Sequence, residues 1–452
     1  MVQLFKILRT LIFAVCGLAL FGAAVRLAQH SPDSIAARGA NTIAKVPEVV
    51  VMTISNLLRD PYAESLTPDP SQEPGSKGEH FVALANHTDH AVEGVVLRTG
   101  MAGAAPRKGW RMLYGIFTID AKPQYGVLVL SPQMAIEKVV VIDGAMLERH
   151  HFSVGQAPYP HGFALLRDGS MLMAFDTDYT PLRVDPCGKR VWAGDEGLTH
   201  AFTPDDAQRF GWGMGARDDL LKVDLASGKT VREIAWQDIA EANPQVSIFA
   251  MRRMDDNALG DNPRGDAGRY YDDSAHINDA EPLPAAFAGA FPEFAAGDLL
   301  ISMRSLNLVL VLDPRSLEIK WFTNDLTLRQ HDADWNPDGS ITVFDNQNGR
   351  DYSRIMRFDP SGTKAPSVAL DGRGYDFYSR IRGKQQGLPG GGFLVTSSQQ
   401  GRAFEVDATG RMVWELLVRD PRNPGRNFVL SEADFFPSDS APVERNLQCP
   451  VS

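Results

Sequence analysis

The sequence of 452 residues predicts an all-β fold, a six-bladed β-propeller. The first observation behind this prediction is a short unit, strand, Asp-led tight turn and strand, which recurs at spacings of 39, 46 and 48 residues. A period of about 40 to 50 residues with several strands per unit is typical of propeller blades. The second is the absence of helical periodicity between the apolar runs, which excludes a parallel α/β fold. A β-sandwich is the structural alternative, but its strands would not repeat one motif at this period.

An aspartate marks the turn of each repeated unit: Asp185, Asp224, Asp313, Asp359 and Asp407. The second and third of these are 89 residues apart, which leaves room for two blades or for one blade with an insert. We predict the insert, because residues 252–275 are polar, rich in Asp and Gly, and without a strand pattern. Residues 125–143 supply an earlier blade, and the predicted count is six.

The first 30 residues predict a signal anchor or a signal peptide. Lys6 and Arg9 precede an uncharged run at 10–25, and Arg26 follows it. We favour an uncleaved single-pass anchor in the inner membrane, with the propeller in the periplasm. The alternative is a secreted or periplasmic protein after signal cleavage. Residues 31–79 are expected to form a linker or stalk that could hold a short helix at 47–58. The propeller is then expected at 80–440, with a C-terminal tail at 441–452.

The composition limits the partners and ligands. A formal net charge of −11 argues against nucleic acid as a partner. No CxxC or HExxH motif occurs, so the sequence predicts neither a metal site nor a cofactor. Cys187 and Cys449 could pair in an oxidising compartment, and we expect at best an optional bond between them. The composition leaves open a homo-oligomer.

Four histidines share one register of the repeat. His161 and His331 each stand seven residues before an Asp-Gly turn that leads into an apolar strand, and His200 and His276 precede the next units. Equivalent positions in successive blades converge on the central channel, where imidazoles suit anion binding, acid–base chemistry, nucleophilic transfer or a metal. The alternative is that these histidines tie loops together by hydrogen bonds. In the last blade Gly383, Lys384 and Gln385 stand in place of a histidine.

The stretch 331–354 holds the densest set of polar residues. His331 enters a hairpin, Asp345 and Asn346 end its strand, and Arg350 and Arg354 follow. A closed hairpin would bring the imidazole near a guanidinium group, and such a pair can bind an oxyanion. The alternative is a plain hairpin with a capping histidine and surface arginines.

Residues 115–417 resemble the bacterial PAPS-independent arylsulfotransferases. The similarity rests on the 331–354 stretch, on His276-Ile-Asn-Asp and on residues 297–304, Gly-Asp-Leu-Leu-Ile-Ser-Met-Arg. It implies a six-bladed enzyme that moves a sulfuryl group from an aryl sulfate to a phenol through a histidine, without a cofactor. Carried over by motif, the implied catalytic residues are His331, His276 and Arg350. The implied substrate-binding residues are His161, His200, Arg354, Asp345 and Asn346.

One departure from the family pattern bears on activity. The resemblance places the nucleophilic histidine C-terminal to the His-Arg motif, and this sequence has no histidine after His331. Either another channel histidine attacks sulfur, or the chain is a non-catalytic, membrane-anchored propeller that binds an anionic ligand, a polysaccharide or a protein.

Overall fold

The computed structural model describes residues 62, 65–72, 81–99, 105–148, 158–176, 179–215, 217–252 and 275–449. The chain divides into two units, and the second, Glu64–Phe152 with Pro158–Ser452, contains all of these residues except Tyr62. The predicted anchor at 1–30, the short helix at 47–58 and most of the 252–275 insert lie outside the described residues. No helix within the described residues is long and apolar enough to span a membrane.

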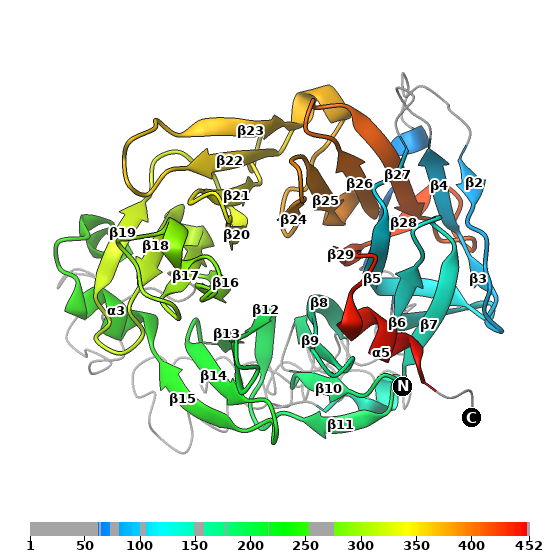
Figure 1. Cartoon of the computed structure of the whole chain (residues 1–452), viewed down its shortest axis with the longest axis horizontal. Helices are drawn as coiled ribbons and strands as arrows, with labels where there is room; N and C mark the ends of the chain where they lie inside the picture. The colour runs from blue at the N-terminus through cyan, green and yellow to red at the C-terminus, as the bar shows by residue number, and fades with distance from the viewer. Residues whose placement is uncertain are drawn as a thin grey trace, which may run out of the picture. The chain divides into compact units, whose positions relative to one another are not determined.

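Six antiparallel sheets surround a common centre, which confirms the predicted six-bladed propeller (Figure 1). Blade 2 contains β8 (Tyr159–Leu165), β9 (Met171–Asp176), β10 (Leu182–Val184) and β11 (Arg190–Ala193). Blade 3 contains β12 (Leu198–Pro204), β13 (Phe210–Gly215), β14 (Leu220–Asp224) and β15 (Thr230–Ile234). Blade 4 contains β16 (Ile277–Pro282), β17 (Leu299–Met303), β18 (Leu308–Leu312) and β19 (Ile319–Thr323). Blade 5 contains β20 (His331–Trp335), β21 (Ile341–Asp345), β22 (Arg354–Phe358) and β23 (Ser367–Asp371).

The two ends of the described chain close the ring. In blade 1 the C-terminal strand β29 (Leu430–Pro437) pairs with β5 (Gly109–Ile119), which is followed by β6 (Lys122–Leu130) and β7 (Ile136–Ile142). In blade 6 the strands β24 (Lys384–Gly387), β25 (Phe393–Ser397), β26 (Arg402–Val406) and β27 (Met412–Val418) are extended by β4 (Val95–Thr99) and β2 (Val82–Ala83). Early strands therefore complete the last blade, and the last strand completes the first.

The remaining elements are short. β1 (Leu66–Pro68) pairs with β28 (Arg426–Phe428), so strand structure begins inside the segment predicted as a stalk. β3 (Val92–Glu93) pairs with β5. The helices are α3 (Trp236–Ala242), α5 (Ala441–Leu447) and the 3₁₀ turns η2 (Pro70–Gln72), η4 (Gly144–Met146), η5 (Ser247–Arg252), η7 (Ala288–Ala290), η8 (Arg304–Leu306), η9 (Gly372–Tyr375) and η10 (Ser398–Gln400). Asp224 and Asp313 belong to consecutive blades, 3 and 4, and α3 and η5 lie between these blades. The long spacing therefore contains no additional blade, as predicted for an insert.

The repeated aspartates explain why the motif recurs. Each ends or directly follows the third strand of its blade, and its side chain accepts a hydrogen bond from the backbone N–H two residues later. The distance is 2.8 Å from Cys187 N to Asp185 and 2.8 Å from Thr409 N to Asp407, and Asp224, Asp313 and Asp359 make the same bond. A carboxylate that closes its own turn in this way fixes a tight hairpin. The repeat is therefore a repeat of turn chemistry.

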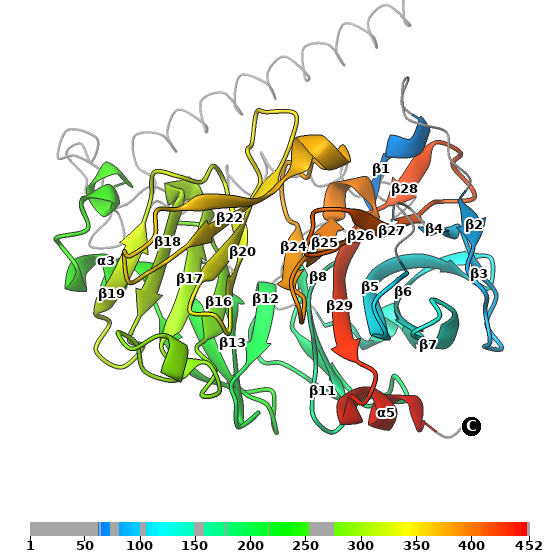
Figure 2. The same cartoon turned by 45° about the horizontal axis from the view of Figure 1, so that its top comes forward.

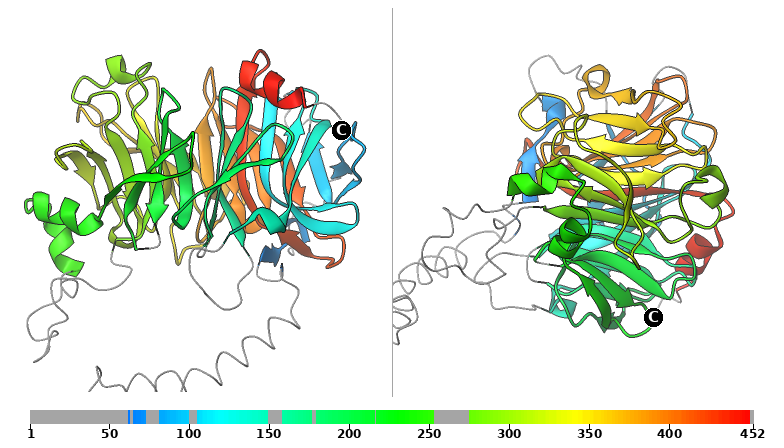
Figure 3. Two further views of the ribbon diagram at one scale, coloured as in Figure 1. Left: turned by 90° about the horizontal axis from the view of Figure 1, so that it is seen from below. Right: turned by 90° about the vertical axis from the view of Figure 1, so that its left-hand side faces the viewer.

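A disulfide fastens the C-terminus. Cys187 and Cys449 are bonded, with 5.2 Å between their Cα atoms, and this corrects the prediction of a merely optional bond. Helix α5 reaches the same region, where Asn446 Nδ2 donates to the carbonyl of Gly169 at 2.8 Å (Figure 3). The sequence did not predict that the two cysteines lie close together, because they are separated by 262 residues.

Candidate active site

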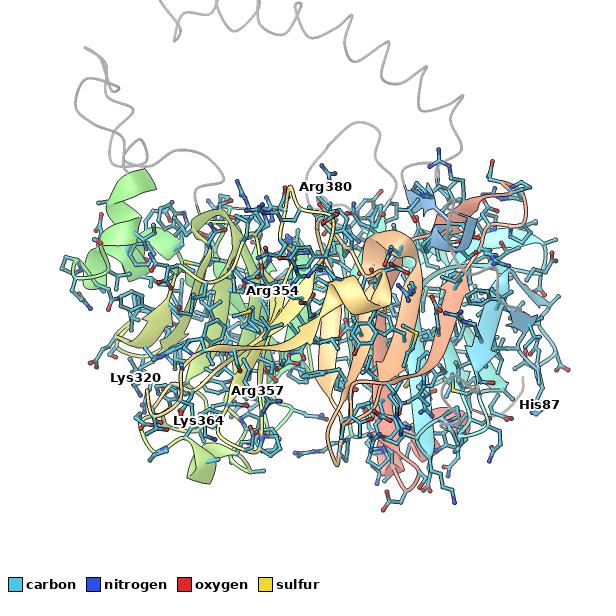
Figure 4. The ribbon with its side chains drawn as sticks, turned by 90° about the horizontal axis from the view of Figure 1, so that it is seen from above. His87, Lys320, Arg354, Arg357, Lys364 and Arg380 are labelled. Atoms are coloured by element: carbon cyan, nitrogen blue, oxygen red, sulfur yellow. A yellow bond between two sulfur atoms is a disulfide. The ribbon has the colours of Figure 1, made fainter. Side chains whose placement is uncertain are left out.

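The innermost strand of each blade lines the centre: β8, β12, β16, β20, β24 and β29 (Figures 1 and 2). We call the end where the chain enters these strands the entry face, and the opposite end, where they turn back, the turn face. In Figure 4 Arg354 and Arg380 lie toward the entry face, and Arg357 and Lys364 toward the turn face. Five of the six inner strands have a shifted register near their entry ends. Such β-bulges re-aim side chains and often occur beside active sites.

The four predicted histidines lie at these irregular positions. His161 and His200 lie within the shifts of β8 and β12, His331 borders the shift of β20, and His276 comes directly before β16. His200 and His276 have positive φ angles of 62° and 47°. A left-handed backbone is uncommon for a residue other than glycine and is concentrated at functional sites. The shared register in the sequence thus corresponds to a shared place in the structure.

His161 belongs to a buried network. Its Nδ1 lies 2.5 Å from Asp176 Oδ1, and the other carboxylate oxygen of Asp176 is bonded to Arg382. The guanidinium of Arg382 also donates to the carbonyl of Pro160 at 2.9 Å and stacks 3.7 Å over the ring of Tyr159. Asp176 therefore orients both an imidazole and a guanidinium group, which leaves Nε2 of His161 for other contacts.

His200 lies between two other imidazoles. Its ring centre is 4.5 Å from that of His161 and 5.0 Å from that of His276, and the Nε2 atoms of His200 and His276 are 3.2 Å apart. The Nδ1 of His200 is 2.8 Å from the hydroxyl of Thr199, which itself donates to the carbonyl of Met214. The hydroxyl must then accept from Nδ1–H. The Nε2 of His200 consequently carries the lone pair, and it accepts a hydrogen bond from Nε2–H of His276.

His331 uses both of its ring nitrogens within the fold. Nδ1 donates to Asn346 Oδ1 at 2.7 Å, because the amide nitrogen of Asn346 is itself a donor to the carbonyls of Ser379 and Arg382. Nε2 accepts from the backbone N–H of Arg382 at 3.2 Å. This histidine, 4% exposed, holds the segment that carries Arg382. Asn346 is likewise a positioning residue for that segment.

Burial disfavours the charged form of three of these imidazoles, those of His161, His200 and His331. It lowers the pKa of His161 to about 4, although Asp176 acts in the opposite direction. It also holds the pKa of His200 and His331 well below the ordinary value. Burial would raise the pKa of Asp176, but Arg382 and His161 outweigh it and hold that pKa well below its usual range. At neutral pH the site therefore contains neutral imidazoles beside an ionised Asp–Arg pair.

The ligand atoms of His161, Asp176 and His200 lie within 4.8 Å of one another, so this group could hold a metal ion. The carboxylate, however, already binds an imidazole and a guanidinium group. A cation beside Arg382 would have to displace one of these partners.

A comparison with protein-family models matches residues 200–419 to the arylsulfotransferases (ASST). This match supports an assignment to the arylsulfotransferase family. The matched stretch includes His200, His276, His331 and Arg382, whereas His161 and Asp176 precede it. A search of curated proteins found no match.

Several solved structures match this chain at low similarity. A protein of unknown function from Bacteroides caccae has 9% identity over 72% of this chain and 98% of that chain, with a TM-score of 0.45. BamB from Moraxella catarrhalis has 13% identity over 73% and 76%, with a TM-score of 0.32. Virginiamycin B lyase from Staphylococcus aureus has 11% identity over 63% and 86%, with a TM-score of 0.36.

The structure places the two predicted arginines between the end of β21 and the start of β22. Arg350 is exposed in a turn, where its backbone N–H donates to Gln347. Arg354 is held by Asp345 at 2.8 Å and by the carbonyl of Leu326 at 2.9 Å. These contacts fit a hairpin with paired strands, and a sulfate-binding role for Arg350 stays a prediction.

The sequence analysis missed Asp176 and Arg382. Their side chains meet although they are 206 residues apart, because the inner strands of blades 2 and 6, β8 and β24, lie on either side of β29 in blade 1 (Figure 1). One signal was available. Arg382 comes directly before the Gly383-Lys384-Gln385 stretch that breaks the histidine register, so a charged residue stands where the last blade should supply an imidazole.

Proposed function

We propose that this protein transfers a sulfuryl group from an aryl sulfate ester to a phenol, with His200 as the nucleophile and His276 as its partner. The observation that carries the proposal is the pair of Nε2 atoms 3.2 Å apart, with the lone pair assigned to His200. The family of residues 200–419 supports the same reaction class. Residues 276 and 200 are both half-buried, so the pair is in reach of a ligand.

In the first half-reaction Nε2 of His200 attacks sulfur while the bond between sulfur and the aryl oxygen breaks. The aryloxide leaves with its electron pair and takes a proton from water. The product is an N-sulfo-histidine whose Nδ1–H remains bonded to Thr199. This contact keeps the ring oriented and disperses the positive charge that develops on it.

In the second half-reaction a phenol replaces the first product. His276 accepts the phenolic proton on Nδ1, because its Nε2 already carries a hydrogen, and passes it to the hydroxide left by the first half-reaction. The phenolate oxygen attacks sulfur, and the N–S bond breaks, which returns the lone pair to His200. The positive charges of Arg382 and Arg304 lie close enough to act on the imidazoles, and they favour the sulfate oxygens. In this scheme His331 positions Arg382 by accepting a hydrogen bond from its backbone N–H.

The test is turnover of 4-nitrophenyl sulfate by the full chain with added phenol, in the presence of EDTA. We expect acid-labile sulfate on the peptide containing His200 and near-complete loss of turnover in His200→Ala. His276→Ala should lose about 10²–10⁴-fold. His90→Ala is the matched control, because this exposed histidine pairs with Asp120 away from the channel. Sulfate on another histidine, or parental turnover in His200→Ala, would refute the assignment.

A binding protein without turnover is the second candidate. It is favoured by His331, whose ring nitrogens both serve the fold. Calorimetry with 4-nitrophenyl sulfate distinguishes the two candidates. A binder should take up the ester stoichiometrically and release no nitrophenolate.

We also propose that the propeller functions in an oxidising compartment, the periplasm. The disulfide between Cys187 and Cys449 supports this, because such bonds persist outside the cytosol. Protease added to spheroplasts should digest the propeller, and protection would contradict export.

A further inference from the structure

A second set of side chains fills the other half of the channel. A cavity of about 750 Å³ opens toward the turn face, and no histidine is among its lining residues. Its wall includes six carboxylates from the inner strands of blades 4, 5 and 1: Asp279, Glu281, Asp332, Asp334, Glu432 and Asp434. The volume is that of a typical small-molecule site.

Several of these carboxylates have a structural duty. The inner strand of a blade leaves N–H groups on its free edge, and a carboxylate of the preceding blade accepts from them. Asp279 accepts from Ala333 N at 2.8 Å, and Glu432 accepts from Phe163 N at 3.0 Å. Each such bond uses a single oxygen of the carboxylate. Blade-to-blade contacts therefore account for part of the acidic wall and leave acceptor capacity facing the cavity.

The basic residues balance only a fraction of this charge. Lys384 Nζ lies 2.8 Å from Asp332 and 4.0 Å from Glu432. The other basic residue that lines the cavity, Arg357, is engaged at the mouth by Asp338 at 2.7 Å. Six carboxylates thus share one ammonium group in a largely buried space. Uncompensated buried carboxylates are costly, and a bound cation would relieve that cost.

The opposite wall is apolar. Blades 2 and 3 supply Phe163 and Phe202, which are 5% and 1% exposed, together with Ala164 and Leu165. The cavity therefore has an acidic side and an apolar side, across which an amphipathic ligand could lie.

Gln385 provides an independent sign of a missing partner. It lines the cavity and is 5% exposed. Its amide nitrogen donates to Asp334 at 2.6 Å and to Thr342 at 2.9 Å. Its carbonyl oxygen Oε1 has no hydrogen-bond partner among the residues that the structure describes. A buried acceptor of this kind calls for an N–H donor.

We propose that this cavity binds an organic cation, a primary ammonium group carried on an aromatic body. The ammonium group would lie among Asp334, Asp434 and the Oε1 of Gln385, and the aromatic body would pack on the half-buried Ala164 and Leu165 of the apolar wall. A bare metal ion fits less well, because within the described chain only His161, Asp176 and His200 bring three ligand atoms within 4.8 Å of one another. The proposal does not depend on sulfuryl transfer, since it concerns separate residues and a separate readout.

The experiment is calorimetric titration of the full chain with 2-phenylethylamine, and with 2-phenylethanol as the neutral match. We expect the amine to bind at least about ten times more tightly than the alcohol, since a charge-assisted hydrogen bond is lost. Asp434→Asn should weaken the amine about tenfold or more. Asp168→Asn, an exposed turn aspartate of blade 2, should leave binding unchanged.

Three results would overturn the proposal. They are equal affinity for the alcohol, unchanged amine affinity in an Asp434→Asn protein that melts like the parent, and binding of Ca²⁺ or spermidine without binding of the amine. Should Asp434→Asn fail to fold, Gln385→Leu tests the same ammonium position through the unpaired acceptor. Unchanged amine affinity in that variant would also overturn the proposal.

Discussion

The two halves of the channel use the same strands for opposite chemistry. His331 and Asp332 are neighbours in β20, yet the imidazole bonds to Asn346 and to the backbone of Arg382 while the carboxylate lines the acidic cavity. Burial acts on both halves by disfavouring the charged form. It lowers the pKa of His161 to about 4 and raises the pKa of Asp279 to about 7. The register shift between His331 and Ala333 lies at the boundary between the two halves.

The largest expected effect is that one substitution removes sulfuryl transfer while another weakens amine binding. His200→Ala should remove nearly all sulfuryl transfer and leave 2-phenylethylamine binding unchanged, because the cavity lining includes no histidine. Asp434→Asn should do the reverse and keep turnover within about twofold of the parent. Initial rates and calorimetry on the same preparations measure both quantities. Loss of both activities in either variant would show that the halves form one site.

The next effect concerns the stability of the acidic half. Lys384→Met removes the ammonium group and leaves Asp332 and Glu432 buried without it. Removal of one partner from a buried ion pair costs about 3–5 kcal/mol, so the free energy of unfolding should fall by that order. Urea denaturation measures it. The double change Lys384→Met with Asp332→Asn should recover part of the loss, and failure to recover would contradict a charge origin.

A smaller effect tests the supporting role of His331. His331→Ala leaves the Asn346 carbonyl and the Arg382 N–H without their partner, which should cost about 1–3 kcal/mol of stability. If it acts only through Arg382, kcat should fall less than in His200→Ala, and a sulfated His200 peptide should still form. Disappearance of that peptide in a stably folded His331→Ala protein would return the nucleophile to His331.

Much of the fold could be predicted because its signals are local. The Asp-led turns repeat since each aspartate bonds to an N–H two residues away, as Asp185 and Asp407 do. The histidine register was visible for the same reason: a fixed distance to an Asp-Gly turn places His161 and His331 at equivalent points of their blades. The acidic half also left a signal, which the sequence analysis missed. An acidic residue, an alanine and a second acidic residue recur in three inner strands, at 279–281, 332–334 and 432–434.

The details of the site depended on contacts across the ring. Asp176 reaches Arg382 only after the ring closes, and the Nε2 atoms of His200 and His276 meet between two blades. The hairpin at 331–354 was predicted correctly, but Asp345 lies directly opposite Arg354 in its register. That pairing directs the guanidinium into the blade, and no pattern in the sequence fixes such a direction.

The smallest effect is a difference in pH dependence between the halves. The pKa of Asp434 is raised to about 7, mainly by burial, so the folded state binds more protons than the unfolded state between about pH 4 and 7. Its contribution to stability falls as pH rises through that window. The pKa of His161 is lowered to about 4, so the unfolded state binds more protons between about pH 4 and 6.5. Its contribution rises with pH over that range.

The two slopes oppose each other in the parent, and single variants should separate them. Relative to the parent, the melting temperature of Asp434→Asn should rise by about 2 °C or more from pH 4.5 to 7.5, and that of His161→Gln should fall over pH 4.5 to 6.5. Asp168→Asn is the control, because hydrogen bonds from Ser170 and the charge of Arg183 outweigh burial and lower the pKa of this carboxyl. Its contribution is lost only as pH falls below about 4, so the difference should stay flat across the tested range. Parallel slopes for Asp434→Asn and His161→Gln would mean that the imidazoles and carboxylates titrate as one network. The division of the channel into two halves would then fail.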